Sequence, residues 1–144
     1  MLGMTNEQVI ECNRGVIETF RAHEGVMPEG PFHNNPTLLL TMTGARSGRR
    51  LTTPLTYTID EDGSLIVMAS AGGSPILPAW GHNVRADPRV TVECLGETYE
   101  ARAVEAVDVE RDRVLGRMVR ALPRLGEYQT TVERKIPLFR LVRG

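Results

Sequence analysis

The sequence predicts a mainly β fold of the α+β class, in which five or six short strands form a small closed barrel. The strand-like segments are β-branched or alternate between apolar and polar residues, and turn sequences such as "DEDG" and "LGE" lie between them. Helical patterns occur only at the start, in the middle and near the end of the chain. Because short strands joined by hairpins must bury one face, this order favours a closed barrel over a sandwich.

The first predicted element is an amphipathic helix over residues 6–23. Thr5 and Gln8 have the spacing of a capping box, and apolar residues then recur at helical spacing. Residues 25–36 are rich in Pro, Gly and Asn and are expected to form an ordered loop. We expect the helix to cover one end of the sheet, and a contact of its apolar face with a membrane surface is the alternative.

The strands follow, with two further helices between them. The predicted strands cover residues 37–42, 51–59, 64–70, 89–95, 98–107 and 136–142. A short helix is expected over residues 78–86, because prolines open this segment and Asp-Pro closes it. A second helix is expected over residues 109–121, where apolar residues fall near one face. No repeat or second domain is visible, so residues 1–144 are predicted to form a single domain.

Bulk composition excludes several classes of function. Seventeen basic and eighteen acidic residues give a formal charge of -1, which does not support nucleic-acid binding. Cys12 and Cys94 lie far apart and have neither a metal-ligand nor a disulfide-framework spacing, so no metal site is predicted. No run approaches the roughly 18 apolar residues of an integral membrane segment. The expected location is the cytoplasm, with peripheral membrane contact as the alternative.

A loop with concentrated positive charge is the first candidate for a binding site. In "TGARSG", Gly44 and Gly48 flank Arg46 and Ser47, which gives the loop freedom to expose backbone N–H groups. Arginine binds phosphate or carboxylate through charge-assisted hydrogen bonds worth about 1.5–3 kcal/mol each. The loop lacks the Gly-Lys-Ser/Thr ending of a P-loop. A solvated arginine-rich hairpin is the structural alternative.

Two more patches are candidates for contacts with a flat ligand. In "ASAGGSP", residues 69–75, small side chains would let a ring lie against backbone, although a plain Gly-Gly turn explains them equally well. In "PAWGHN", residues 78–83, Trp80 is either a core anchor or a ligand platform. No GxSxG motif or nucleophile with a neighbouring base is present. An enzyme without catalytic side chains usually takes its chemistry from a cofactor.

Four ordered blocks together resemble the deazaflavin-dependent nitroreductase family, whose members are actinobacterial reductases that use reduced coenzyme F420. The blocks are "LLLTMTGARSGRRLTTPLTY", "VMASAGGSP", "PAWGHNVRADPRVTVE" and "YQTTVERKIPLFRL". The resemblance implies a split β-barrel of the FMN-binding and flavin reductase type. It also implies a small-molecule substrate. Related barrels often dimerise, so a homodimer is compatible with the resemblance.

The resemblance further implies which residues contact the coenzyme. Its phosphate and polyglutamate tail would meet the loop after the first strand and the strand that follows it, namely Ala45, Arg46, Ser47, Arg49, Arg50, Leu51, Thr52, Thr53, Pro54, Leu55 and Thr56. The ring would lie along Met68, Ala69, Ser70 and Ala71. The phosphate side would be enclosed by Ala79, Trp80, Gly81, His82 and Asn83. Tyr128 matches an active-site tyrosine of the family, and Ser70 is a second catalytic candidate.

The expected reaction is hydride transfer from reduced coenzyme F420 to the β-carbon of an activated alkene, such as an unsaturated lactone, ester or enone. Tyr128, Ser70 or solvent would supply the proton. Two alternatives remain open at this point. Leu51 and Ala71 stand where many relatives have arginine and lysine, which makes binding of FMN or FAD more credible, and the domain can also be a non-catalytic carrier of the deazaflavin. Gly81 replaces a common aromatic residue and is expected to leave a roomier pocket.

Overall fold

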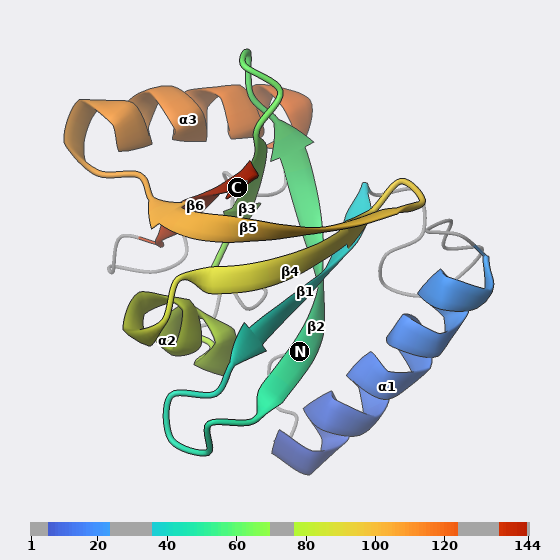
Figure 1. The fold of residues 1–144 in the computed structure, drawn as a ribbon. Helices are drawn as coiled ribbons and strands as arrows, with labels where there is room; N and C mark the ends of the chain where they lie inside the picture. Colours follow the sequence, from blue (N-terminus) through green and yellow to red (C-terminus); the bar gives the residue numbers. More distant parts are fainter. Residues whose placement is uncertain (1–5, 24–35, 70–76, 124–135, 144) are drawn as a thin grey trace.

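The protein forms a closed antiparallel barrel with helices at its periphery. The structure, a computed structural model, describes residues 6–23, 36–69, 77–123 and 136–143. Within these residues the strand order around the barrel is β1-β2-β3-β6-β5-β4 (Figure 1). This arrangement confirms the predicted fold class. Residues 25–35 of the predicted loop, together with Ser70, Ala71 and Tyr128, lie outside the described residues.

Each predicted strand and helix is present, with ends that differ from the prediction by one or two residues. The strands are β1 Thr37–Thr43, β2 Arg50–Ile59, β3 Leu65–Met68, β4 Arg89–Cys94, β5 Glu97–Glu105 and β6 Leu138–Arg143. The helices are α1 Asn6–Ala22, α2 Ala79–Ala86 and α3 Asp108–Ala121. None of the described helices is long and apolar enough to cross a membrane.

Long-range strand pairs close the barrel. The hairpins β1–β2, β2–β3 and β4–β5 join neighbours in sequence, as expected. Closure comes from β1 beside β4, where Leu40 is opposite Val92. The last strand, β6, lies between β3 and β5 and pairs Phe139 with Val67 and Leu141 with Ala103.

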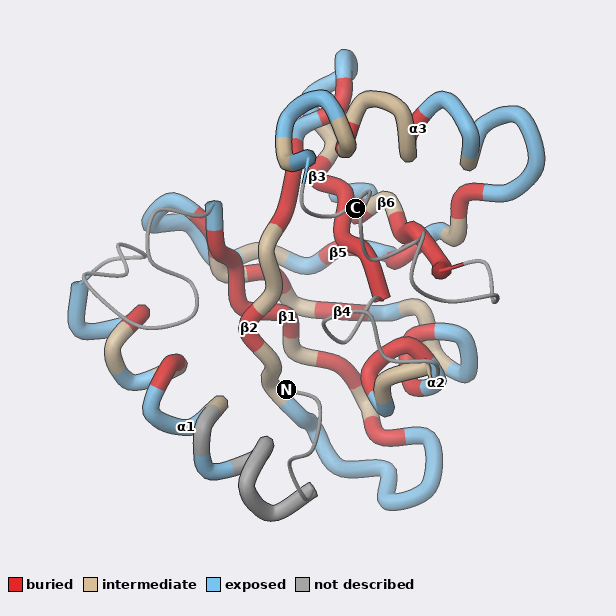
Figure 2. The backbone as a smooth tube through the Cα atoms, turned by 180° about the vertical axis from the view of Figure 1, so that it is seen from behind, coloured by how far each residue is buried: buried red, intermediate tan, exposed pale blue. Residues whose placement is uncertain are grey.

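Strand β1 is buried on both faces, which explains its unbroken apolar run. Leu38 and Leu40 point into the barrel core, where they belong to the same cluster as Phe139. Leu39 points outward and packs against Val16 and Phe20 of α1, and Figure 2 draws this helix beside the strands. Helix α1 therefore covers part of the outer face of the sheet, whereas the sequence predicts that it covers one end of the sheet.

Helix α3 covers another part of the outer face. Its Val114 and Met118 are fully buried against Ile66 and Met68 of β3 and Leu138 of β6. Burying a side chain of this size stabilises the fold by roughly 1.5–3 kcal/mol. This second apolar cluster fixes the helix that leads toward the segment carrying Tyr128.

Candidate functional site

The loop between β1 and β2 is held in shape by its own backbone. The Gly44 N–H donates to the Arg49 carbonyl at 2.7 Å, and the Gly48 N–H donates to the Gly44 carbonyl at 2.9 Å. The Arg49 N–H donates to Ser47 Oγ at 3.2 Å. Gly48 has a φ of +71°, a value that glycine adopts without strain. The sequence predicts free backbone N–H groups here, but three of them already donate within the loop.

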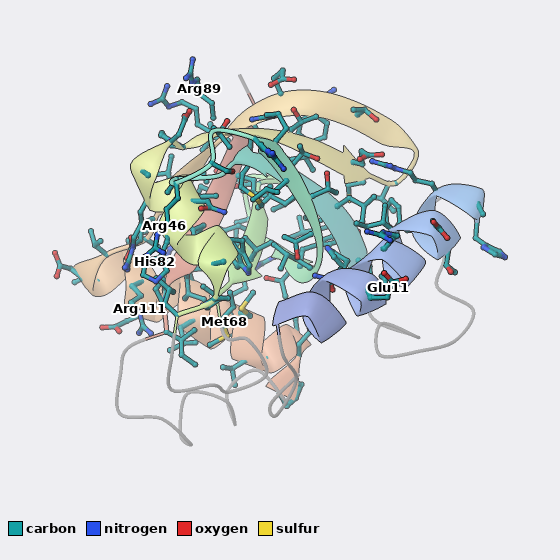
Figure 3. The ribbon with its side chains drawn as sticks, turned by 90° about the horizontal axis from the view of Figure 1, so that it is seen from below. Glu11, Arg46, Met68, His82, Arg89 and Arg111 are labelled. Atoms are coloured by element: carbon teal, nitrogen blue, oxygen red, sulfur yellow. The ribbon has the colours of Figure 1, made fainter. Side chains whose placement is uncertain are left out.

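Asn83 of α2 fastens this loop to the helix. The Ala45 N–H donates to Asn83 Oδ1 at 2.9 Å, and the Asn83 side chain is buried. Figures 1 and 2 both draw the exposed loop beside α2. His82 is exposed, and Figure 3 shows it on the same side of the molecule as Arg46. Two segments that are far apart in the sequence thus form one surface.

The three arginines of the loop differ in their partners. Arg46 and Arg49 are exposed, and their side chains make no hydrogen bond or ion pair with any residue in the described part of the chain. Arg50 donates to Thr43 Oγ1 at 3.1 Å and to Thr91 Oγ1 at 3.0 Å. Two guanidinium groups are therefore available to an anion, and the third is already hydrogen-bonded to the sheet.

Next to this loop, one edge of β2 has no partner strand among the described residues. Tyr57 donates its N–H to the Pro36 carbonyl, and Gly44 makes the equivalent bond to Arg49 at the other end of the β1–β2 ladder. Hydrogen-bonding pairs alternate along such a ladder, so Thr52, Pro54 and Thr56 direct their backbone groups away from β1.

On that side, β3 pairs only with Tyr57–Ile59, and no other described strand reaches the first part of β2. Proline is found at strand edges because it has no N–H to donate, which suits Pro54. Thr56 is next in register to Met68 of β3, so within the described residues it is the Thr52 N–H that has no partner strand on this edge.

The side chains of this predicted coenzyme-binding run do not share one face. Leu55 packs against the barrel core, whereas Pro54 is buried on the outer face opposite Leu39. Leu51 is 43% exposed, and its Cδ1 would lie 3.2 Å from a Cβ placed on Gly44. Contacts from the run to one ligand must therefore come mainly from its backbone edge.

Several predicted contact residues belong to the core instead. The Trp80 ring lies 5.6 Å from the Phe139 ring at an angle of 59°, which supports the core-anchor interpretation of this tryptophan. Ala69 is fully buried, and Met68 is buried beneath α3. These buried residues support the backbone that carries the exposed residues of the candidate site.

The expectation of a roomier pocket at Gly81 is wrong. A Cβ on this glycine would meet Leu77 Cδ1 at 2.8 Å, so the leucine side chain fills the space that an aromatic residue would take. Gly81 is itself buried and permits close packing. The exposed residues of α2 are Ala79, His82, Arg85 and Ala86.

The local charge remains positive although the whole chain is nearly neutral. Asp87, at the end of α2, has a lowered pKa because Arg89 hydrogen-bonds to its carboxylate, at 3.0 Å for the Nη2 contact. This acid is thus paired and does not offset Arg46 or Arg49. Among the described residues, no group of three His, Cys, Asp or Glu side chains could hold a metal.

Two sets of side-chain hydrogen bonds at the site could not be predicted from the sequence. Asn83 was predicted to touch the coenzyme, but its role in holding Ala45 depends on a contact between residues far apart in the chain. Thr91 and Glu100, which lie behind Arg50, were not predicted at all. Only the strand register, in which Thr91 is opposite Glu100, brings them together.

Comparison with known proteins connects this site to redox chemistry. A family model described as F420H(2)-dependent quinone reductase matches residues 12–142. An F420H(2)-dependent quinone reductase of Mycobacterium tuberculosis is 38% identical over 112 residues, which are 75% of this chain and 74% of that protein. The same identity and coverage are found for a putative F420H(2)-dependent quinone reductase of Mycobacterium bovis.

Solved structures give the same result. An F420-H2 dependent reductase, FDR-A, has a TM-score of 0.67 and 37% identity, with coverage of 74% of this chain and 93% of its own. A structure described as a domain-swapped dimer has a TM-score of 0.68 and 31% identity, with coverage of 95% and 99%. An FAD-binding protein of Mesorhizobium loti, at 18% identity and a TM-score of 0.54 over 76% of this chain and 79% of its own, shares the fold alone.

Proposed function

Because this chain belongs to the F420H(2)-dependent quinone reductase family, we propose that it is an oxidoreductase whose coenzyme lies between the β1–β2 loop, the free edge of β2 and the exposed face of α2. The acceptor would be a conjugated carbonyl compound. Quinones and the enones or unsaturated lactones expected from the sequence share a C=C–C=O unit, which accepts a hydride readily. The coenzyme is F420, as the sequence resemblance implies.

The residues present suit an anionic, flat coenzyme. The Arg46 and Arg49 side chains have no partner among the described residues, and a charge-assisted hydrogen bond from either would contribute about 1.5–3 kcal/mol to binding. The Thr52 N–H on the β2 edge can donate to a ring carbonyl, and the edge carbonyls can accept from ring N–H groups. The single observation that carries the proposal is this strand edge beside two arginines, neither of which has a side-chain partner in the described part of the chain.

When bound, reduced coenzyme F420 supplies a hydride, which delivers two electrons and one proton to the acceptor. The chain itself would bind and orient the two planes, and this positioning is expected to provide most of the rate enhancement. Tyr128 and Ser70 are the proposed groups for hydrogen-bonding the acceptor carbonyl, with Tyr128 or solvent as the source of the second proton. Met68 and α3 would close the apolar side of the site.

A panel of acceptors tests this function. Oxidation of reduced coenzyme F420 should accelerate with a simple quinone such as menadione, and a second arm uses an unsaturated lactone. Faster turnover of the quinone would assign the family's named activity to this chain. Faster turnover of the lactone would instead assign reduction of an activated alkene. No oxidation with either acceptor, despite saturable coenzyme binding, would contradict the enzymatic proposal and support a carrier.

We also propose that the protein is a homodimer. The structure described as a domain-swapped dimer resembles nearly the whole chain, at 31% identity, and this supports the proposal. Light scattering coupled to size-exclusion chromatography should give twice the monomer mass. A monomer mass over the full concentration range would contradict this proposal without affecting the chemistry.

A further inference from the structure

We propose that Arg50 is a positioning residue for the coenzyme-binding loop and is not one of the coenzyme's anion ligands. Sequence resemblance groups it with Arg46 and Arg49, but its contacts differ from theirs. Its guanidinium bridges β1 and β4 through Thr43 and Thr91. The inference rests on the proposed function, because the loop that Arg50 positions is the one assigned to the coenzyme.

Hydrogen-bond polarity fixes the direction of this bridge. The Thr91 hydroxyl donates its single proton to Glu100 Oε1 at 3.0 Å, so it can only accept from Arg50. The result is a chain of two hydrogen bonds, in which Arg50 donates to Thr91 and Thr91 donates to Glu100. The carboxylate at the far end complements the positive charge of the guanidinium.

The strand register explains why Arg50 points this way. Arg50 is opposite Thr43, and the neighbouring pair Thr52 and Thr41 joins its hydroxyls at 2.8 Å, so these side chains share the outer face of the sheet. Thr91 is opposite Thr41 on the next strand and shares that face. Arg50 is therefore directed across three strands and away from the loop tip that carries Arg46.

The bridge acts where the loop joins the sheet. Arg50 is the first residue of β2, and the residue before it, Arg49, accepts the N–H of Gly44 at 2.7 Å. Holding Arg50 on β4 thus fixes the backbone pair at the base of the loop. Loss of the bridge would leave Arg49 and the loop less well oriented, while both unpaired guanidinium groups would keep their charge.

Four single variants separate positioning from direct anion binding. Arg50→Gln removes the guanidinium, Arg50→Lys keeps a charge but cannot span both threonines, and Thr91→Val removes one partner while leaving Arg50 intact. Arg102→Gln is the matched control, since Arg102 is an exposed arginine of β5 without a partner among the described residues. Two measurements are made on each: the Kd of coenzyme F420 at low and at raised salt, and the Tm of the ligand-free protein.

If Arg50 positions the loop, Arg50→Gln, Arg50→Lys and Thr91→Val should each raise Kd about tenfold, the effect expected from losing a well-made hydrogen bond. Each should lower the Tm, and the Arg50→Gln and Thr91→Val effects should not add in the double variant. The salt dependence of Kd should match that of the unchanged protein, because no ion pair to the ligand is lost. Arg102→Gln should change neither quantity.

Direct anion binding gives the opposite pattern and would overturn the inference. Arg50→Lys would then bind nearly normally, Arg50→Gln would show a weaker salt dependence, and Thr91→Val would leave Kd unchanged. Failure of the proposed function can be distinguished from failure of the Arg50 inference. If the proposed function is wrong, the unchanged protein does not bind the coenzyme. Additive Tm effects of Arg50→Gln and Thr91→Val in ligand-free protein would overturn only the inference that Arg50 and Thr91 act together.

Discussion

At the scale of single residues, anion binding depends on guanidinium groups that have no other partner. Within the part of the chain that the structure describes, Arg46 meets this condition, and it lies in the loop that Ala45 connects to α2 through a hydrogen bond to Asn83. Arg46→Ala should raise the coenzyme Kd by about 10- to 100-fold, the equivalent of a lost charge-assisted hydrogen bond. The rate of hydride transfer at saturating coenzyme should change much less, because on the proposed function the arginine would bind the tail and not the reacting ring.

Binding titration and single-turnover kinetics on the same preparation measure both effects. Arg102→Ala controls for the loss of one positive charge and should leave Kd unchanged. A large loss in the hydride-transfer rate with a normal Kd would contradict the assignment of Arg46 to tail binding.

A second residue-scale effect concerns stability. Thr58 is 5% exposed, and its Oγ1 has no hydrogen-bond partner among the described residues. A buried hydroxyl without a partner destabilises the folded state, so Thr58→Val should raise the free energy of unfolding by about 1 kcal/mol. Denaturant unfolding measures the change.

Thr41→Val is the matched control, since its hydroxyl bonds Thr52 Oγ1 at 2.8 Å. That variant should lose stability by about 1 kcal/mol. Equal effects of the two substitutions would show that the Thr58 hydroxyl is satisfied in solution.

Residue identity predicted the loop and its positive charge, but it did not predict which acceptors the backbone N–H groups of the loop would bond. Glycine and arginine in "TGARSG" indicate a turn that can meet an anion. Whether the Ala45 N–H is free depends on Asn83, which is 38 positions away and reaches it only after the barrel closes. Likewise, the position of Trp80 in the core depends on Phe139 from the last strand.

At the scale of elements, the proposed site lies where the strands β2 and β3 differ in length. Strand β2 has ten residues and β3 has four, so the first part of β2 extends beyond its partner. Pro54 is compatible with that position because no ladder needs its N–H. Alternation in "LTTPLTYTI" predicts a strand, but it does not predict which edge is left without a neighbour.

A buried carboxylate fastens α3 to the strands. Asp60 is 2% exposed and accepts hydrogen bonds from Arg113 at 2.7 and 3.0 Å and from Arg140 at 2.8 Å. Glu110 pairs with the same two arginines. Hydrogen bonds from Arg113 hold the pKa of Asp60 well below its ordinary value of 3.8, with the Arg140 charge a lesser cause.

Asp60→Asn should lower the free energy of unfolding by about 1.5–3 kcal/mol, because the buried carboxylate that accepts charge-assisted hydrogen bonds from Arg113 and Arg140 is lost. The carboxylate contribution is present above pH 3.8, where the unfolded group would also be ionised, and is lost as the pH falls toward the lower folded pKa. The stability gap between the two proteins should therefore be constant near neutral pH and shrink below about pH 4.

Denaturant unfolding as a function of pH measures this gap. Glu61→Gln is the control, since Glu61 is 79% exposed and its nearest arginine nitrogen is 3.9 Å away. It should change stability by less than about 0.5 kcal/mol. A gap that persists unchanged at low pH would mean that Asp60 does not act through its charge.

At the scale of the whole molecule, the strand order could not be predicted from the sequence. Turns such as "DEDG" specify hairpins locally, but the pairing of β6 with both β3 and β5 joins segments that are far apart in the chain. No local pattern encodes that register. The family resemblance supplied the barrel type, and periodicity supplied the elements within it.

On the proposed function, the complete barrel would give the site its preference for an anionic coenzyme. The chain has a formal charge of -1, yet the β1–β2 loop carries two arginine side chains without partners among the described residues, and Figure 3 shows Arg46 on the same side as His82 of α2. A long-range field would attract any anion, whereas such a local arrangement would recognise one that carries charge and a flat ring together.

Competitive titration of the purified protein with coenzyme F420 and FMN tests this central claim most directly. The account predicts saturable binding of coenzyme F420, weakened by Arg46→Ala, and FMN binding that is at least tenfold weaker because its shorter anionic portion reaches fewer loop donors. Tighter binding of FMN, or binding of coenzyme F420 that Arg46→Ala does not affect, would contradict it.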